Sequence, residues 1–149
     1  MSLAKVVSTS FSDDRDFVEY DMKDAYRDAT NLVSLTRSLE YVRSENRVVV
    51  TDKVAFSEAG RFETALTTFG GVEDLGGGLY RFAAMNGKAT ALCKVSVKGA
   101  AWHLEQEKLP MDAGSQFSDY VKSKPLRLAV VLDDPVHEAE VKVTWEVAH

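Results

Sequence analysis

Two charged side chains, Arg37 and Asp52, interrupt strand faces that are otherwise apolar. Arg37 lies in an alternating run over 31–43 and Asp52 in another over 47–57. Residues i and i+2 share a face of a strand, so each charge sits in a row of apolar side chains. These are Leu35, Leu39 and Tyr41 around Arg37, and Val48, Val50, Val54 and Phe56 around Asp52. The pattern predicts an inward-facing ion pair that fixes the register of the two strands.

The length of the connection between the two runs decides how the pair meets. The apolar faces coincide only if the loop has an even number of residues. A loop at Ser44–Arg47, or its inner pair Glu45-Asn46, sets Asp52 diagonal to Arg37. A loop centred one residue earlier sets the two directly opposite. An arginine side chain reaches across either separation.

The three histidines offer little catalytic chemistry. His103 lies in a predicted strand, and Glu105 and Glu107 share its face. Two or three such groups on one strand are too few for a zinc site without ligands from elsewhere. His137 lies in a predicted turn among carboxylates, and His149 is the last residue. We therefore predict no catalytic residue, no metal and no cofactor.

Aromatic side chains raise the question of sugar binding, which needs rings exposed on one sheet face. Trp102, His103 and Tyr80 are the candidate binding residues, and Trp102 has the best claim to exposure. Trp145 shares its parity with valines and is predicted to be core. Cys93 follows an apolar stretch and is predicted to be a half-buried strand cysteine and not a nucleophile.

The composition is that of an ordinary globular protein. The 149 residues are 45% hydrophobic and 28% charged, with a net charge of −5. This acidic balance argues against a nucleic-acid partner, which needs clustered Lys and Arg. No apolar run approaches the roughly 20 residues of a membrane helix. A single cysteine excludes an intramolecular disulfide.

Short alternating segments between turn residues predict an all-β fold, an antiparallel β-sandwich of about eight to ten strands. One or two short helical turns at most are expected, one of them within Asp21–Ala29. A single domain is expected over 1–149, with residues 1–3 an addition to the natural sequence. The predicted strands are 4–10, 16–22, 31–43, 47–57, 61–69, 79–85, 88–98, 101–107, 126–133 and 138–147.

The connections carry their own signals. Met85-Asn86-Gly87-Lys88 predicts a hairpin with a type I′ turn, which needs positive φ at Asn86 and Gly87. Gly76-Gly77-Gly78 is predicted to be a flexible connection and not a phosphate loop, because no Lys-Ser/Thr follows it. Residues 110–124 are predicted to be a loop, with a short helix at Gln116–Lys122.

One stretch resembles the C-terminal β-sandwich region of heparinase II/III-like polysaccharide lyases, which include alginate and oligoalginate lyases. It reads YDMKDAY…LTRSLEYVRSENRVVVTDKVAFSEAGRFETALTTFG. An Asp-x-x-x-Ala-Tyr segment (Asp21, Ala25, Tyr26) precedes an Arg-centred strand (Arg37, Leu39, Tyr41). A VVVTDKV strand follows, and then a strand ending in LTTFG. The resemblance covers about residues 16–70.

The resemblance implies a parent protein with an N-terminal α/α toroid that cleaves acidic polysaccharide by β-elimination, in the periplasm or outside the cell. The family's catalytic Tyr and His residues and its zinc ligands lie in segments that have no counterpart here, so none is carried over. This chain is therefore expected to be a non-catalytic part of such a lyase. It would support the toroid and line the uronate cleft, where Arg37 could instead face an acidic sugar.

Two other functions stay open. The chain could be a free-standing carbohydrate-binding or protein-interaction module, or a complete small enzyme. The missing acid and base make the enzyme the least favoured. An excised domain should also expose a face or an edge strand, so self-association through one of these is expected.

Overall fold

Alternation of apolar and polar residues produces eleven strands in the computed structural model, which describes residues 4–109 and 125–148. The strands are β1 (Lys5–Phe11), β2 (Arg15–Asp21), β3 (Leu32–Val42), β4 (Arg47–Gly60), β5 (Glu63–Thr68), β6 (Val72–Gly76), β7 (Leu79–Ala83), β8 (Thr90–Lys98), β9 (Trp102–Lys108), β10 (Leu126–Leu132) and β11 (Val136–Ala148). Two single-turn 3-10 helices, η1 (Lys23–Ala25) and η2 (Arg43–Glu45), complete the described elements. The predicted all-β class is confirmed.

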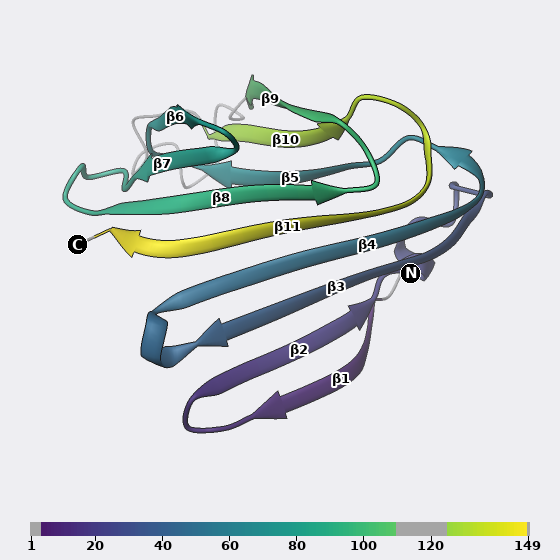
Figure 1. Cartoon of the computed structure of the whole chain (residues 1–149), viewed down its shortest axis with the longest axis horizontal. Helices are drawn as coiled ribbons and strands as arrows, with labels where there is room; N and C mark the ends of the chain where they lie inside the picture. Colours follow the sequence, from purple (N-terminus) through teal and green to yellow (C-terminus); the bar gives the residue numbers. More distant parts are fainter. Residues whose placement is uncertain (1–3, 110–124, 149) are drawn as a thin grey trace, which may run out of the picture.

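The strands form two antiparallel sheets that pack as a β-sandwich (Figure 1). The large sheet has eight strands in the order β1-β2-β3-β4-β11-β8-β7-β6, and the small sheet has three in the order β5-β10-β9. β11 pairs with β4 on one side and β8 on the other, so the last strand joins the two halves of the large sheet.

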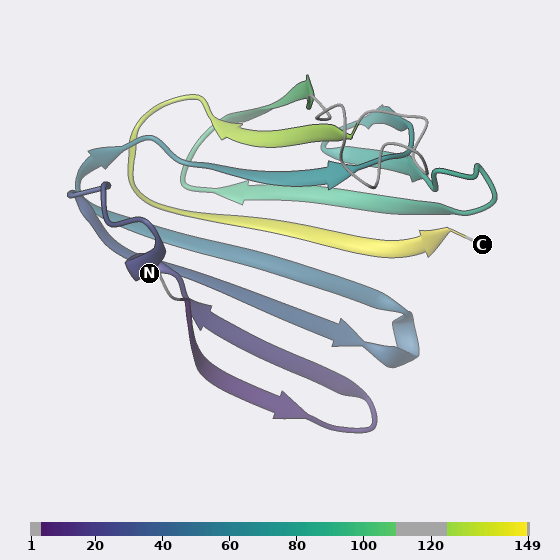
Figure 2. The ribbon, with the colours of Figure 1, turned by 180° about the vertical axis from the view of Figure 1, so that it is seen from behind.

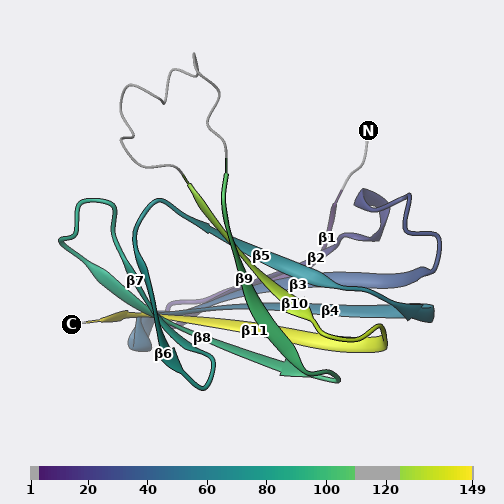
Figure 3. The same cartoon turned by 90° about the horizontal axis from the view of Figure 1, so that it is seen from above.

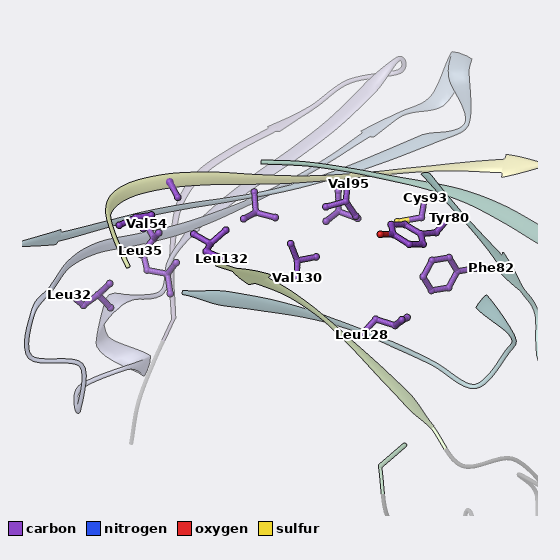
Figure 4. Close-up of a cluster of buried hydrophobic side chains, with 14 residues drawn as sticks. Leu32, Leu35, Val54, Tyr80, Phe82, Cys93, Val95, Leu128, Val130 and Leu132 are labelled. Carbon is purple, nitrogen blue, oxygen red and sulfur yellow. The ribbon is translucent and has the colours of Figure 1, made fainter. Parts of the chain in front are cut away.

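The core lies between the small sheet and the β3-β4-β11-β8-β7 part of the large sheet. Leu128, Val130 and Leu132 of β10 point into it and are at most 1% exposed (Figure 4). Val141 and Val143 of β11 meet them from the large sheet. β10 is buried because it is the middle strand of the small sheet and lies over the middle of the large one.

The small sheet covers only part of the large one, because its strands cross those beneath obliquely (Figure 3). Burial therefore falls along rows of cross-strand neighbours. One row runs from β8 to β1 through Val95, Val143, Val50, Leu39, Val18 and Thr9. Val95 and Val143 are each 2% exposed, the next three are half-buried, and Thr9 is exposed.

This leaves an uncovered apolar area near the β1–β2 and β3–β4 hairpins, which we call the open face. We define it by Phe11, Val18, Leu39, Tyr41 and Val48, which lie on the side of the large sheet that also carries the core. β1 and β2 lie on the side of the sheet farthest from the small sheet (Figures 1 and 2). The sequence pattern indicated an inward-facing row at Leu39, Tyr41 and Val48, which are half-buried on the core side of the sheet. Phe11, which that pattern did not include, is 71% exposed.

Two turn predictions need correction. Asn86 does not have positive φ, so the β7–β8 hairpin does not close with a type I′ turn, and only Gly87 is left-handed (φ 68°). Positive φ angles occur instead at Gly76, Gly77 and Gly78 (85°, 59° and 78°), and Gly77 and Gly78 form the tight link from β6 to β7. The glycine run is thus a hairpin turn, and β6 is a strand that the pattern missed.

Some predictions fall outside the described residues. These are the status of residues 1–3, the loop 110–124 with its helix at 116–122, and the position of His149. The helical turn expected within Asp21–Ala29 is confirmed by η1. None of the described segments forms a long apolar helix of the kind that crosses a membrane.

Candidate functional site

Arg37 and Asp52 lie directly opposite each other on β3 and β4. The connecting turn holds η2 and then Asn46, whose φ of 46° lies in the left-handed region that asparagine tolerates. This turn pairs Val42 with Arg47, which gives the second of the two possible registers. Arg37 donates from Nε and Nη2 to the two Asp52 carboxylate oxygens, at 2.6 and 2.8 Å.

The small sheet adds a third member to this pair. Arg37 Nη2 also donates to Thr64 Oγ1 of β5, at 2.9 Å. The Asp52 side chain is 4% exposed and that of Arg37 is 33% exposed, so the carboxylate is buried and the guanidinium reaches solvent. The hydrogen bond to Asp52 raises the pKa of Arg37. The three side chains connect the two sheets where the core ends.

A hollow of about 380 Å³ opens beside this cluster, between the large sheet and β5. Tyr26 and Phe62 line it, as does Arg127, which forms an ion pair with Glu63. Each arginine at the hollow thus has its own carboxylate, and the lining is close to neutral. No histidine among the described residues lines it. The arrangement can orient a polar or carboxylate ligand.

His103 lies elsewhere, on the exposed outer face of the small sheet. Its Nδ1 is 2.5 Å from Asp133 Oδ1, and its Nε2 is 3.2 Å from Glu105 Oε1. The hydrogen bonds to Asp133 and then to Glu105 raise the pKa of His103. The two carboxylates contact opposite ring nitrogens, so they cannot share one metal ion with the ring. The described residues contain no cluster of three or more His, Cys, Asp or Glu that could hold a metal.

The two aromatic candidates do not form a sugar-binding platform. Tyr80 is 6% exposed and belongs to the core, which removes it from the surface. Its parity with buried Phe82 was the signal for this position. Trp102 is half-buried against the core, and its ring lies beside Gly78. Of the three candidate binding residues, only His103 has an exposed side chain, at 51%.

Cys93 is fully buried in the core of the large sheet. Burial raises the pKa of its thiol to about 12. Because the thiolate is the reactive form, this cysteine is an inert packing residue.

The open face carries a shallow apolar hollow of about 180 Å³ at its centre. Leu39, Tyr41 and Val48 line it from β3 and β4, and Phe11 and Val18 from β1 and β2. Sequence reasoning found the parity of Leu39, Tyr41 and Val48 but assigned these residues to the interior. The missing information was the width of the small sheet, which no local pattern encodes.

Comparison with known proteins adds no family assignment. Scans against models of protein families and against curated protein sequences found no match to this chain.

Proposed function

We propose that this chain is a non-catalytic β-sandwich domain of a heparinase II/III-like polysaccharide lyase, and that its open face packs against the remainder of that protein. The observation that carries the proposal is the open face itself, an apolar area of the large sheet that the small sheet leaves uncovered. Contiguous exposed apolar surface of this kind marks an interaction site. Its burial by another domain would remove the exposed Phe11 ring and its neighbours from water.

The residues behind the family resemblance support this reading by their positions. Leu39 and Tyr41 of the Arg-centred strand lie on the open face, and Arg37 shares that side of β3. Tyr26 of the Asp-x-x-x-Ala-Tyr segment lines the hollow next to Arg37. The resemblance therefore concentrates where the domain would meet its parent chain and the parent's substrate.

The hollow beside Arg37 and Arg127 is the proposed point of approach for an acidic sugar. Guanidinium groups donate charge-assisted hydrogen bonds to carboxylates. Asp52 and Thr64 already accept from Nε and Nη2 of Arg37, so Nη1 is the nitrogen left to donate to a ligand. The Arg37 side chain is 33% exposed and that of Arg127 is 29% exposed, so both can contact a ligand from outside. Their own carboxylates reduce the net attraction, so the hollow would line a cleft and would not bind a free sugar tightly.

The experiment compares the complete gene product with this chain alone in an absorbance assay for unsaturated uronate, on alginate and heparan substrates. The complete product should cleave one of these substrates, and the isolated chain should cleave neither. A gene that encodes only this chain would contradict the proposal, as would turnover by the chain alone.

A matched pair of substitutions in the complete product tests the open face. Leu39→Asp places a charge on that face, whereas Ser38→Asp places the same charge on the opposite face of β3. Limited proteolysis should release the Leu39→Asp domain faster than the wild-type domain and leave the Ser38→Asp domain protected. Equal release of the two variants would show that the open face is not the contact.

The second candidate is a free-standing interaction module, and the open face favours a protein ligand over a sugar. Tyr80 is buried and Trp102 is half-buried, so neither of the two aromatic candidates displays its ring to a sugar. Calorimetry with uronate oligosaccharides, with Trp102→Ala as the control, tests the sugar alternative. Absence of heat at high ligand concentration would remove it.

A further inference from the structure

β1 forms one edge of the large sheet, and its outer side has no partner within the described residues (Figure 2). All seven of its residues are exposed. It pairs only with β2, with one register shift between Val6 and Ser8 that leaves Val7 as an extra residue. An edge strand of this kind offers a row of backbone donors and acceptors to another extended chain.

The direction of each backbone group follows from the neighbouring hydrogen bonds. Ser12 N–H donates to Arg15 C=O at 2.9 Å, so the backbone of Ser12 faces β2. In an antiparallel strand successive residues face opposite sides. Ser10 and Ser8 therefore face β2, whereas Phe11 and Thr9 face outward.

The alternation continues past the register shift. Met22 N–H donates to Leu35 C=O, which shows that the even-numbered residues of β2 face β3. Val6 lies opposite Tyr20, an even-numbered residue, so Val6 has no ladder bond to β2 and faces outward. The outer edge of β1 thus presents the backbone groups of Val6, Thr9 and Phe11.

The same three residues point their side chains to the open-face side of the sheet. Thr9 lies opposite Val18, and Phe11 lies opposite Asp16, which pairs in turn with Tyr41. Val6 and Phe11 are 58% and 71% exposed. The free hydrogen-bonding edge and the exposed apolar side chains of β1 therefore coincide.

The second edge of the large sheet, β6, and one edge of the small sheet, β9, carry features that discourage pairing. β6 is short, acidic at Glu73 and Asp74, and irregular where it meets its turn. β9 carries Glu105 and Glu107 along its length. β1 has no charged residue after Lys5. Charges and irregularities are the usual means of blocking edge pairing. β1 has the irregularity at Val7 but no charge after Lys5, whereas β6 has both an irregularity and two acids, so β1 is the less protected edge of the large sheet.

We propose that β1 pairs antiparallel with β1 of a second copy of this chain, with Thr9 at the two-fold axis. Because the extra residue Val7 counts as no step in the ladder, Val6 and Phe11 are each two positions from Thr9. Val6 therefore lies opposite the partner's Phe11 on the same face, and Phe11 lies opposite the partner's Val6. Thr9 faces the partner's Thr9, a pairing that favours a sheet.

In this register the backbone hydrogen bonds and the side chains of the two β1 strands are both complementary. Three outward-facing residue pairs supply about six backbone hydrogen bonds, two for each pair. Lys5 lies opposite the partner's Ser12, so no like charges meet. The two large sheets become one continuous sheet, and the two open faces join on one side of it. A second copy of β1 can therefore accept and donate the backbone hydrogen bonds of the free edge, because Val6, Thr9 and Phe11 are spaced symmetrically about Thr9.

The test is sedimentation equilibrium of the chain as it exists, with two variants at the axis. Thr9→Pro removes an outward-facing N–H and leaves the β2 ladder intact, as proline on an edge strand allows. Thr9→Ala keeps that N–H. Wild type and Thr9→Ala should form a dimer. Thr9→Pro should raise the dissociation constant about tenfold or more, because one substitution removes two symmetry-related hydrogen bonds.

Amide hydrogen exchange of the wild-type chain gives a second readout that needs no variant. The Thr9 and Phe11 amides should gain protection as the protein concentration rises, while the Ser8 and Ser10 amides are protected throughout. A monomer at the highest soluble concentration would overturn the proposal. So would a dimer that Thr9→Pro leaves unchanged and Leu39→Asp disrupts, since that result assigns the contact to the open face. Neither outcome bears on whether the complete gene product is a lyase.

Discussion

Removal of the Asp52 carboxylate should lower the free energy of unfolding by an amount that follows from the hydrogen bonds and the exposure of Arg37. Asp52→Ala leaves the Arg37 guanidinium without its two strongest hydrogen bonds and with only Thr64. Loss of one partner of a buried ion pair costs about 3–5 kcal/mol. The Arg37 side chain is 33% exposed and can regain water, so the lower end applies, about 3 kcal/mol.

The reverse substitution should be worse. Arg37→Met leaves the Asp52 carboxylate buried without its ion-pair partner. The Asp52 side chain is only 4% exposed and cannot regain water unless the sandwich opens. The cost should approach about 5 kcal/mol. The double variant Arg37→Met/Asp52→Leu fills the same space with apolar atoms and should lie within about 1 kcal/mol of wild type.

Urea unfolding of the four proteins measures this cycle. For a chain of this size, about 3 kcal/mol should lower the melting temperature by roughly 6–12 °C. Single variants that unfold like wild type would show that the pair is solvated and that the inward-facing assignment is wrong. A double variant less stable than either single variant would contradict this reasoning. It would show that the intact ion pair itself stabilises the fold, and that the single variants do not lose stability through an unpaired buried charge.

Two further predictions concern His103 and the β6–β7 turn. Hydrogen bonds to Asp133 and then to Glu105 raise the pKa of His103 above 6.5, so its stabilising contribution is complete below that pH and is lost as the pH rises through the folded pKa. The difference in melting temperature between wild type and His103→Gln should therefore shrink as the pH rises above 6.5, and a constant difference would count against the ion pair. A Cβ at Gly78 would lie 2.7 Å from the Val95 carbonyl oxygen, whereas one at Gly77 meets nothing within 4 Å. Since both have positive φ, Gly78→Ala should cost about 2–3 kcal/mol in urea unfolding and Gly77→Ala about 1; equal costs would show that the turn relaxes.

Local patterns were enough to locate most strands and the register-fixing charges. Arg37 and Asp52 lie on consecutive strands joined by a short turn, so parity and loop length restrict their meeting to two registers. β6 escaped detection because its sequence, Val72–Gly76, has one β-branched residue, two acids and a terminal glycine. The hairpin after β7 was found from Asn-Gly, but the turn type depends on loop length, which the dipeptide does not specify.

Contacts between the sheets could not be predicted. Thr64 joins Arg37 only because β5 crosses to the small sheet, and Asp133 meets His103 only because β9 and β10 are neighbours there. These partners are 27 and 30 residues apart in the sequence. The open face has the same origin, since its exposure depends on where a three-stranded sheet ends over an eight-stranded one. Single-residue patterns carry no information on that boundary.

The most direct test of the central claim is the lyase assay on the complete gene product and on this chain in parallel. We expect a longer product that releases unsaturated uronate from an acidic polysaccharide, and no release by the 149-residue chain alone. Release by the chain alone, or a gene that encodes nothing beyond it, would contradict the assignment of a non-catalytic lyase domain.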